Sequence, residues 1–270
     1  MSSPDKKTMP SPGLEEISRY WDRYVSQLKV DGQEWGSPGF FKVVKGAHDP
    51  AYALSTRLLD LENRSGENIL EVGCGMGLDV VEYLRHGLRV SAVDLSPRSL
   101  ELTRRLLGQR GMRARLLMAD AERLPFAGES FDLVVARGIL MYTPDETRAV
   151  REIYRVLKPG GRFLAILHNR HSWFVALARL SGTNRYSEIG DPPINRIHSR
   201  RQARQLFSGF GRLSIVPDKY PARSDRRQGT FARLYNNLFV PLAGLLPRVL
   251  VRSLGYYLIV QGEKPSRSER

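Results

Sequence analysis

Three glycines spaced two residues apart, Gly73-x-Gly75-x-Gly77, follow the apolar run Asn68 to Val72 and precede a helical pattern over Leu78 to His86. Glycines in this setting let the backbone turn tightly and approach a ligand closely, next to a helix N-terminus. Asp94 follows Gly77 after 17 positions, at the end of a second apolar run, where a carboxylate can accept the hydroxyls of a ribose. Strand, glycine turn, helix, strand and acid in this order indicate a site for a nucleoside-containing cofactor.

The chain from Asn68 to Leu167 alternates short apolar runs with helical patterns, which predicts βαβ units and a parallel sheet. Two further apolar runs near the C-terminus predict strands that close the sheet. The expected fold class is therefore α/β, a doubly wound Rossmann-like sheet with helices on both faces. The expected strands are Asn68–Val72, Leu88–Val93, Met112–Met118, Phe131–Ala136, Arg162–Leu167, Leu213–Val216 and Tyr256–Val260.

Capping signals predict where several helices begin and end. Ser96 followed by Pro97 is typical of an N-cap and first helical residue, and Gly87 is placed to end the preceding helix. Thr143-x-x-Glu146 and Ser199-x-x-Gln202 both have the spacing of a capping box, which predicts one helix after each.

The chain is expected to form one domain over residues 59–263, with a cap segment at 14–58 and lid insertions at about 172–198 and 221–253. Residues 1–13 and 264–270 are polar and are expected to be disordered tails. The most apolar stretch, Leu238 to Val260, contains two prolines and two arginines, so no transmembrane segment is expected.

The net charge and the cysteine content indicate which partners and which cellular compartment to expect. Lys and Arg number 42 against 28 Asp and Glu, which gives a net charge of +14 and favours anionic partners. Cys74 is the only cysteine, which excludes an intrachain disulfide and any multi-cysteine metal site. A lone thiol fits a reducing compartment, so we expect a cytoplasmic protein that holds no metal.

The glycine spacing discriminates between cofactors. A dinucleotide site has a third glycine where this chain has Leu78, whereas Glu71 followed by Gly73-x-Gly75-x-Gly77 resembles motif I of the class I S-adenosylmethionine-dependent methyltransferases. The resemblance is closest to the type-11 small-molecule branch. It continues, in order, through Val90–Asp94, Met118–Phe126, Ser130–Val134 and Leu157–Gly161.

The resemblance implies an enzyme that binds S-adenosylmethionine and assigns roles to residues of the cofactor site. Gly73 and Gly75 are implied to pack against the methionyl and ribose portions, with Gly77 in the same turn. The other implied contacts are Glu71 with the ammonium group, directly or through water, Asp94 with the ribose hydroxyls, Leu95 with the adenine face, Asp120 with the adenine amino group and the Ala121 amide with the ring.

Methyl transfer is an in-line displacement at an activated methyl group, so most of the protein's contribution is alignment and exclusion of water. Ligands of open α/β sheets bind at the carboxyl ends of the strands, which places Arg137, Tyr142 and His168 beside the methyl group. His168 is the first candidate for a general base, and His48 in the cap segment is another. Arg137 is a candidate for holding an anionic acceptor.

The sequence Ala136-Arg137-Gly138-Ile139 lacks the Pro-Pro-aromatic motif and the cysteine that base-methylating enzymes carry after strand four. A small, partly apolar acceptor is therefore favoured: a phenolic or quinone-type ring, a lipid or a specialised metabolite. Three alternatives stay open. The 12 arginines between Arg170 and Arg233 suit a tRNA or rRNA methyltransferase, Leu234 to Leu254 suits peripheral membrane contact, and an intact cofactor site also suits a non-catalytic regulatory protein.

Overall fold

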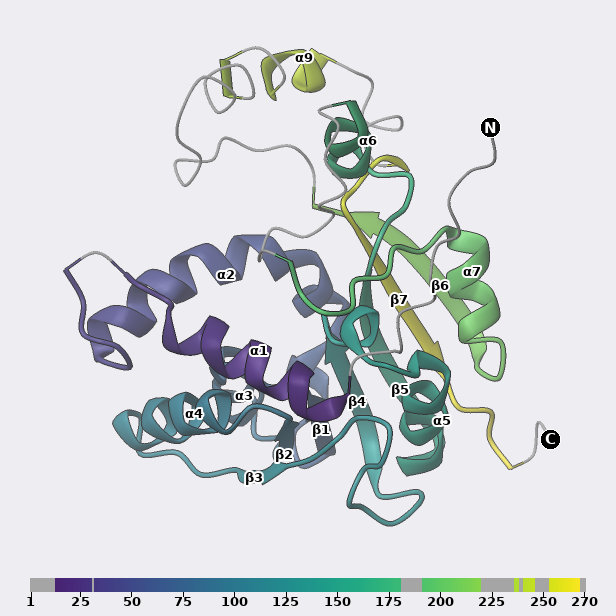
Figure 1. Cartoon of the computed structure of the whole chain (residues 1–270). Helices are drawn as coiled ribbons and strands as arrows, with labels where there is room; N and C mark the ends of the chain where they lie inside the picture. Colours follow the sequence, from purple (N-terminus) through teal and green to yellow (C-terminus); the bar gives the residue numbers. More distant parts are fainter. Residues whose placement is uncertain are drawn as a thin grey trace.

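The computed structural model describes residues 13–30, 32–180, 191–219, 236–237, 240–245 and 253–267. These residues form an α/β fold around a seven-stranded sheet with the strand order β3-β2-β1-β4-β5-β7-β6 (Figure 1). All neighbouring strands are parallel except β7, which runs antiparallel to β5 and to β6. The strands are β1 (Asn68–Val72), β2 (Arg89–Asp94), β3 (Arg115–Met118), β4 (Phe131–Arg137), β5 (Leu157–His168), β6 (Gly211–Asp218) and β7 (Tyr257–Glu263). The predicted doubly wound sheet is confirmed.

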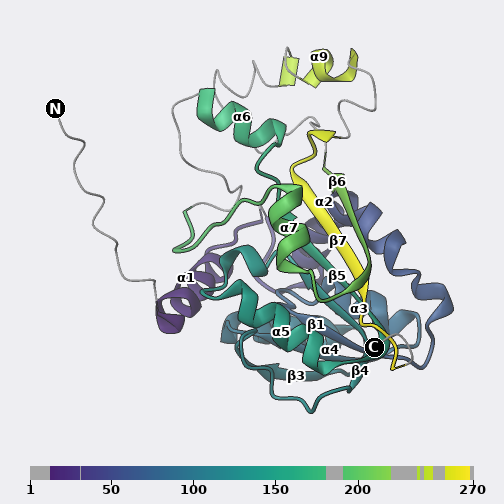
Figure 2. The ribbon, with the colours of Figure 1, turned by 90° about the vertical axis from the view of Figure 1, so that its right-hand side faces the viewer.

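Helices cover both faces of the sheet (Figure 2). One face carries α2 (Pro38–Leu59), α3 (Leu78–Arg85) and α4 (Pro97–Gln109), and the other carries α5 (Glu146–Val156) and α7 (Arg200–Leu206). Each face has its own apolar core, built around residues such as Leu59 and Leu102 on the first and Ile153 and Phe207 on the second. Burying an aliphatic side chain of this size contributes roughly 1.5–3 kcal/mol, so the two cores fix the strand ends that frame the site.

Two of the predicted helix starts are confirmed and one is wrong. The Ser96 hydroxyl accepts the Ser99 amide, and Ser199 and Gln202 form a complete capping box. Thr143 is not an N-cap, because its hydroxyl donates to the Ile139 carbonyl and completes a short 3-10 turn, η2 (Leu140–Tyr142). The following helix, α5, is capped by Asp145, whose side chain accepts the Arg148 amide.

Strands β3 and β5 differ from their predicted lengths. β3 begins at Arg115 rather than Met112, because the Met112 amide donates to the Leu107 carbonyl and ends α4. β5 begins at Leu157 and runs through the expected turn at Lys158–Gly161, where Gly160 and Gly161 exchange backbone hydrogen bonds with Lys264.

The expected C-terminal tail begins later than predicted. Lys264 is 4% exposed and its ammonium group donates to the Leu157 carbonyl at 2.7 Å, so this residue belongs to the fold. Residues 1–12 and 268–270 of the expected tails lie outside the described residues, whereas residues 13 and 265–267 are described.

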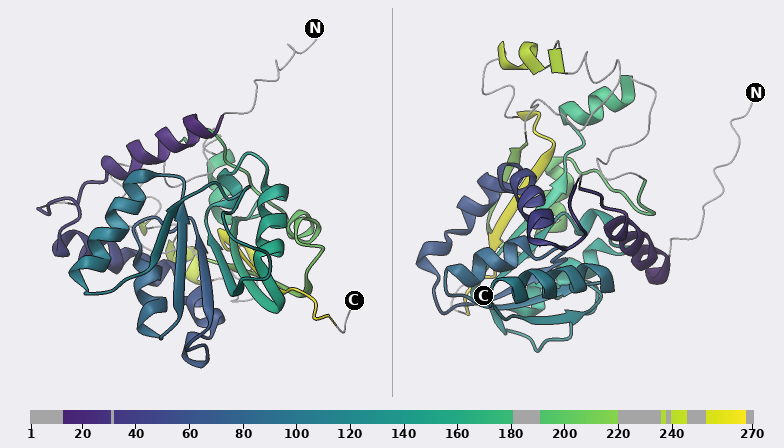
Figure 3. Two further views of the ribbon diagram at one scale, coloured as in Figure 1. Left: turned by 90° about the horizontal axis from the view of Figure 1, so that it is seen from below. Right: turned by 90° about the vertical axis from the view of Figure 1, so that its left-hand side faces the viewer.

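Three helices lie toward the carboxyl ends of the parallel strands (Figure 3). They are α1 (Leu14–Ser26), α6 (Trp173–Leu180) and the short α9 (Val240–Leu245). The expected lid at 172–198 contains α6, whereas most of the one at 221–253 lies outside the described residues apart from α9. Within the described part of the chain, no helix is both long enough and apolar enough to cross a bilayer.

Candidate active site

A cavity of about 230 Å³ opens at the carboxyl ends of β1, β2 and β4, beneath α1. Most of its wall is apolar. It is lined by eight residues that the sequence analysis singled out: Gly73, Gly75, Asp94, Leu95, Asp120, Ala121, Arg137 and Tyr142. Glu71, Gly77 and His168 do not line it.

The glycine turn forms the floor of the cavity. Gly75 has a φ of +53°, and a Cβ atom placed on it would meet no heavy atom within 4 Å, so it would project into open space. Gly77 instead lies against Thr103 of α4, where an added Cβ would approach the threonine Cγ2 to 2.7 Å. Gly75 therefore leaves room for a ligand, while Gly77 lets α3 and α4 pack closely.

Asp94 ends β2 and presents a buried carboxylate to the cavity. Its Oδ2 accepts the Gly75 amide at 2.8 Å, and its Oδ1 accepts the Ser96 amide at 2.9 Å. A carboxylate has about four acceptor positions, so the group can take further hydrogen bonds from a ligand. Burial raises the pKa of Asp94 to about 6.

Asp120 and Ala121 follow β3 and line the side wall beside Asp94. The Ala119 amide donates to the Asp94 carbonyl at 3.1 Å, which continues the β2–β3 pairing into this loop. Asp120 closes a tight turn, because its Oδ1 accepts the Glu122 amide at 2.9 Å. The turn fixes the carboxylate at the rim, where it can accept a hydrogen bond from a ligand.

Helix α1 roofs the cavity with apolar and aromatic side chains that include Ile17, Trp21 and Tyr24. The Trp21 ring packs edge-on against Tyr142, with ring centroids 5.0 Å apart. The Ser18 hydroxyl donates to the Leu95 carbonyl at 3.0 Å. The sequence predicted a cap over residues 14–58, but not that α1 would be the part that lines the cavity.

Glu71 lies in β1 behind the glycine turn and is 2% exposed. The Tyr83 hydroxyl of α3 donates to its Oε2 at 2.7 Å, and burial raises the pKa of Glu71 well above its ordinary value. Glu71 therefore lies behind the cavity wall, and its implied contact with an ammonium group, directly or through water, stays a prediction.

Arg137 ends β4 and forms a buried ion pair with Asp79 of α3. Its Nη2 donates to the Thr56 hydroxyl at 3.2 Å. The His48 Nε2 lies 3.3 Å from the second Asp79 oxygen. Burial raises the Asp79 pKa, but Arg137 and His48 outweigh that effect and the net pKa is lowered. Both Arg137 and His48 are thus engaged with one carboxylate.

His168 ends β5 and is 4% exposed. Its Nδ1 lies 3.0 Å from the Asn195 Oδ1, so the proton sits on Nδ1 and Nε2 accepts. The Nε2 faces the Tyr256 hydroxyl at 3.1 Å and the Tyr142 hydroxyl at 3.4 Å. Burial lowers the pKa of His168 to about 4. His168 therefore reaches the cavity only through the Tyr142 side chain.

Sequence reasoning missed Asn195 and Tyr256, because nothing local marks either residue as a partner of His168. Asn169 and His171, which also follow β5, stay outside the cavity. The Asn169 side chain ties the loop after β5 to the segment before β7, since its Nδ2 donates to the Gly255 carbonyl and its Oδ1 accepts the His171 amide.

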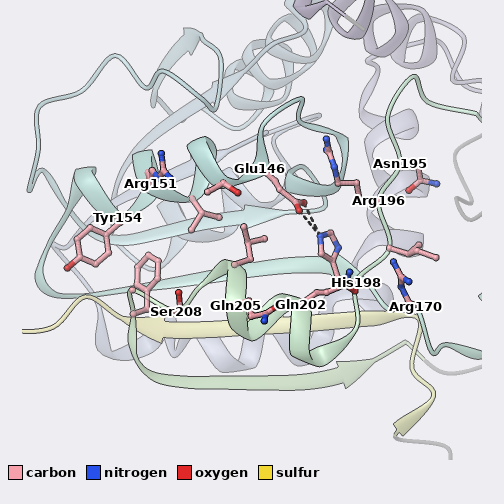
Figure 4. A pocket seen from close by; sticks show the side chains of 16 residues that line it. Glu146, Arg151, Tyr154, Arg170, Asn195, Arg196, His198, Gln202, Gln205 and Ser208 are labelled. Atoms are coloured by element: carbon pink, nitrogen blue, oxygen red, sulfur yellow. Dashed lines mark hydrogen bonds and ion pairs between the residues drawn. The ribbon is translucent and has the colours of Figure 1, made fainter. Parts of the chain in front are cut away.

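A second cavity, of about 950 Å³, lies between α5 and α7 on the other face (Figure 4). His198 and Glu146 face each other across it, with Nε2 and Oε2 2.9 Å apart. Arg196 turns away to donate to the Thr143 and Pro144 carbonyls. The predicted cofactor residues do not line this cavity. Asn195 lines this second cavity and contacts His168, which in turn contacts Tyr142 at the first.

The described residues contain no group of three or more His, Cys, Asp or Glu side chains that could hold a metal ion. The described residues that line the first cavity include the carboxylates of Asp94 and Asp120, the guanidinium group of Arg137 and the phenols of Tyr24 and Tyr142.

The family model described as a methyltransferase domain matches residues 70–165, which carry β1 to β5 and the cavity floor. Over these residues the chain is similar to methyltransferase domains. The Methyltransferase GfsG of Streptomyces halstedii is 36% identical over 164 residues, covering 57% of this chain and 58% of that protein. The Sterol 4-C-methyltransferase strm-1 of Caenorhabditis elegans is 31% identical over 106 residues, covering 38% and 32%.

The chain thus spans less than two thirds of either relative. Among solved structures, the geranyl diphosphate C-methyltransferase from Streptomyces coelicolor A3(2) aligns with a TM-score of 0.63 at 20% identity. The alignment covers 95% of this chain and 99% of that chain, so the methyltransferase fold extends beyond the family match.

Proposed function

We propose that this protein transfers a methyl group from S-adenosylmethionine to a small, partly apolar acceptor. One observation carries the proposal: the cavity beneath α1 brings Gly73, Gly75, Asp94 and Asp120 together at the carboxyl ends of adjacent strands. That is where open α/β sheets bind nucleoside ligands. The methyltransferase domain at residues 70–165 supports the same cofactor.

The residues present fit S-adenosylmethionine. The open space above Gly75 admits a close backbone approach, and Asp94 retains acceptor capacity for two ribose hydroxyls. Asp120 and Ala121 lie beside Asp94, where the adenine attached to that ribose would extend, and Leu95 offers an apolar face. The described residues that line the cavity include no lysine, which suits a cofactor without phosphate groups.

The bound cofactor supplies an electrophilic methyl group, so this chain's residues need to align the acceptor and exclude water. Trp21 and Ile139 line the cavity on opposite sides and keep its interior apolar. Tyr142 presents its phenol at the edge nearest β5 and is oriented by His168. We propose that Tyr142 contacts the acceptor, and that His168 positions Tyr142 instead of acting as the base.

The side chains that line the cavity and the substrates of the compared proteins both support one class of acceptor. Ile17, Trp21 and Tyr24 suit a ring or an aliphatic chain. The two compared proteins whose names state a substrate act on a sterol and on geranyl diphosphate, and both molecules contain a large hydrocarbon portion. We propose a ring-bearing or isoprenoid-like acceptor, in the class of the phenols, quinones, lipids and specialised metabolites.

Incubation with methyl-labelled S-adenosylmethionine and fractionated cell extract tests this proposal. We expect label in the small-molecule or lipid fraction, and an Asp94→Ala variant should lose it. Label recovered only in a defined RNA nucleotide at physiological salt would replace the proposal with a tRNA or rRNA methyltransferase. Cofactor binding without any turnover would replace it with a regulatory role.

A further inference from the structure

The second cavity, between α5 and α7, has no role in the proposed function. Its volume of about 950 Å³ lies within the range of clefts that hold small molecules. Arg151 and Tyr154 lie toward one end of it, and Arg170 and His198 lie toward the other (Figure 4). Because the predicted cofactor residues do not line this cavity, a ligand bound there would be distinct from the cofactor.

Three guanidinium groups give this cavity an excess of positive charge. Those of Arg151 and Arg170 are exposed and, within the described part of the chain, have no hydrogen-bond or ion-pair partner. The guanidinium of Arg196 donates to the carbonyls of Thr143 and Pro144, which carry no net charge. Cations of one sign gathered along a hollow raise the local concentration of anions. The cavity is therefore suited to a negatively charged ligand.

The carboxylate that lines the cavity does not neutralise these arginines. Glu146 is the one acid among the described lining residues, and the His198 Nε2 lies 2.9 Å and 3.1 Å from its two oxygens. Both oxygens of Glu146 thus face a histidine that is 4% exposed. In the described part of the chain, Glu146 forms no ion pair with an arginine. A ligand would supply the counter-charge that Arg151 and Arg170 lack.

The remaining wall offers apolar and aromatic surface. It includes Val150 and Tyr154 of α5, Leu206 of α7, and Phe210. The rings of Tyr154 and Phe210 pack edge-on with centroids 5.1 Å apart, which fixes the orientation of both. A ring or short hydrocarbon placed against them would be partly removed from water. The cavity therefore combines an apolar wall with a cationic end at Arg170.

We propose that this cavity binds a small phosphorylated molecule with an apolar body. The phosphate is held by Arg170, whose planar guanidinium can donate to two phosphate oxygens at once, and the apolar body lies against Tyr154 and Phe210. Arg151 adds positive charge beside the apolar body. The site goes beyond the proposed function, because the methyl acceptor has to meet the cofactor in the first cavity.

Calorimetric titration of the full chain with phenyl phosphate and with inorganic phosphate tests this site. We expect phenyl phosphate to bind at one site and inorganic phosphate to bind about tenfold more weakly, because it lacks the ring. Saturating S-adenosylhomocysteine should leave the affinity for phenyl phosphate unchanged. Loss of phenyl phosphate binding in its presence would place the probe in the first cavity and overturn the proposal. Failure of the wild-type protein to bind phenyl phosphate would overturn it as well.

Two variants and a matched control locate the probe. Arg170→Gln should weaken binding of phenyl phosphate about tenfold, since it removes a charge-assisted hydrogen bond. Tyr154→Leu should bring the two affinities closer together, mainly through weaker binding of phenyl phosphate. Arg204→Gln is the control, because it removes an exposed arginine of α7 that does not line the cavity, and it should bind as the wild-type protein does.

Equal losses in Arg170→Gln and Arg204→Gln would indicate general attraction to a basic surface and would overturn the site. An RNA oligonucleotide that bound more tightly than phenyl phosphate, with the same loss in both arginine variants, would replace the proposal with an RNA-binding surface. Salt separates these outcomes further, because affinity for a polyanion falls steeply as salt rises, whereas a single phosphate gives a shallow dependence.

Discussion

The Asp22 carboxylate of α1 accepts a hydrogen bond from the hydroxyl of Ser96, the residue that caps α4. The same Asp22 oxygen accepts the Arg98 amide at 3.1 Å. Because α1 lines the roof of the cofactor cavity, these hydrogen bonds hold the roof against the N-terminus of α4, the helix that follows Asp94. We therefore expect this contact to slow the passage of a ligand beneath α1.

Replacing Asp22 with alanine should therefore speed release of the cofactor. We expect S-adenosylhomocysteine to dissociate about threefold to tenfold faster, since a hydrogen bond to a charged group contributes roughly 1.5–3 kcal/mol and part of it is replaced by water. Stopped-flow fluorescence of Trp21, which lines the cavity, measures the rate. Glu16→Ala removes an exposed acid from the same helix and is the control. Equal dissociation rates in Asp22→Ala and Glu16→Ala would contradict the idea that the Asp22 contact slows cofactor release.

Asp94 should set both the strength and the pH dependence of cofactor binding. Asp94→Ala is expected to weaken binding by roughly 1–3 kcal/mol, the cost of leaving hydroxyl groups without their acceptor. In the free protein the pKa of Asp94 is about 6, and ribose hydroxyls donate to the ionised form. Ligand binding therefore favours the carboxylate, and affinity should fall as the pH drops below about 6.

Calorimetry from pH 7.5 to pH 5 checks this dependence. Binding at the lower pH should release protons from the wild-type protein, and Asp94→Asn should lose this release and bind with little change over the range. A wild-type affinity that stays constant down to pH 5 would contradict the assignment of Asp94 to the ribose.

Alanine substitutions at Gly75 and Gly77 should affect different properties: cofactor binding at Gly75, and mainly the free energy of unfolding at Gly77. A methyl group on Gly75 projects into the cavity, so Gly75→Ala should weaken cofactor binding. Both positions have positive φ, which costs roughly 1–2 kcal/mol for alanine. Gly77→Ala adds a clash with the Thr103 side chain and backbone, so it should lower the free energy of unfolding more than Gly75→Ala does. Urea unfolding and calorimetry on the two variants give both quantities, and the reverse order of stability would contradict this division.

The sequence predicted those parts of the site that depend on position along a strand. Gly75 and Asp120 follow a strand and Asp94 ends one, and the carboxyl ends of parallel strands meet at one edge of the sheet. Their location therefore follows from the order of the elements alone. The same logic placed Arg137 at the correct edge.

The roles of the other site residues depend on side-chain partners that come from distant segments of the chain. Nothing near Arg137 indicates that it pairs with Asp79, which is 58 residues away. His168 is oriented by Asn195, 27 residues further along the chain. The helix start at Thr143 was wrong for a local reason, because Asp145 also offers a capping oxygen and a preceding 3-10 turn already uses Thr143. Spacing alone does not rank these competing caps.

His168 should make the stability of the protein depend on pH. Burial lowers its pKa from 6.5 to about 4 in the folded state, so between these values the unfolded chain binds a proton that the folded chain does not. The stabilising contribution is fully present above pH 6.5 and is lost as the pH falls toward 4. Between pH 7 and pH 5 the loss should be on the order of 2 kcal/mol.

Urea unfolding at several pH values measures that loss, and His168→Gln should reduce the dependence over this window. His171→Gln replaces an exposed histidine three residues away and should retain the wild-type dependence. The neutral imidazole predicted here also keeps Nε2 free to accept from Tyr142, so methyl transfer in His168→Gln should fall without a matching loss of cofactor affinity. A variant that lost cofactor affinity and activity in equal measure would instead place His168 among the groups that support the cofactor site.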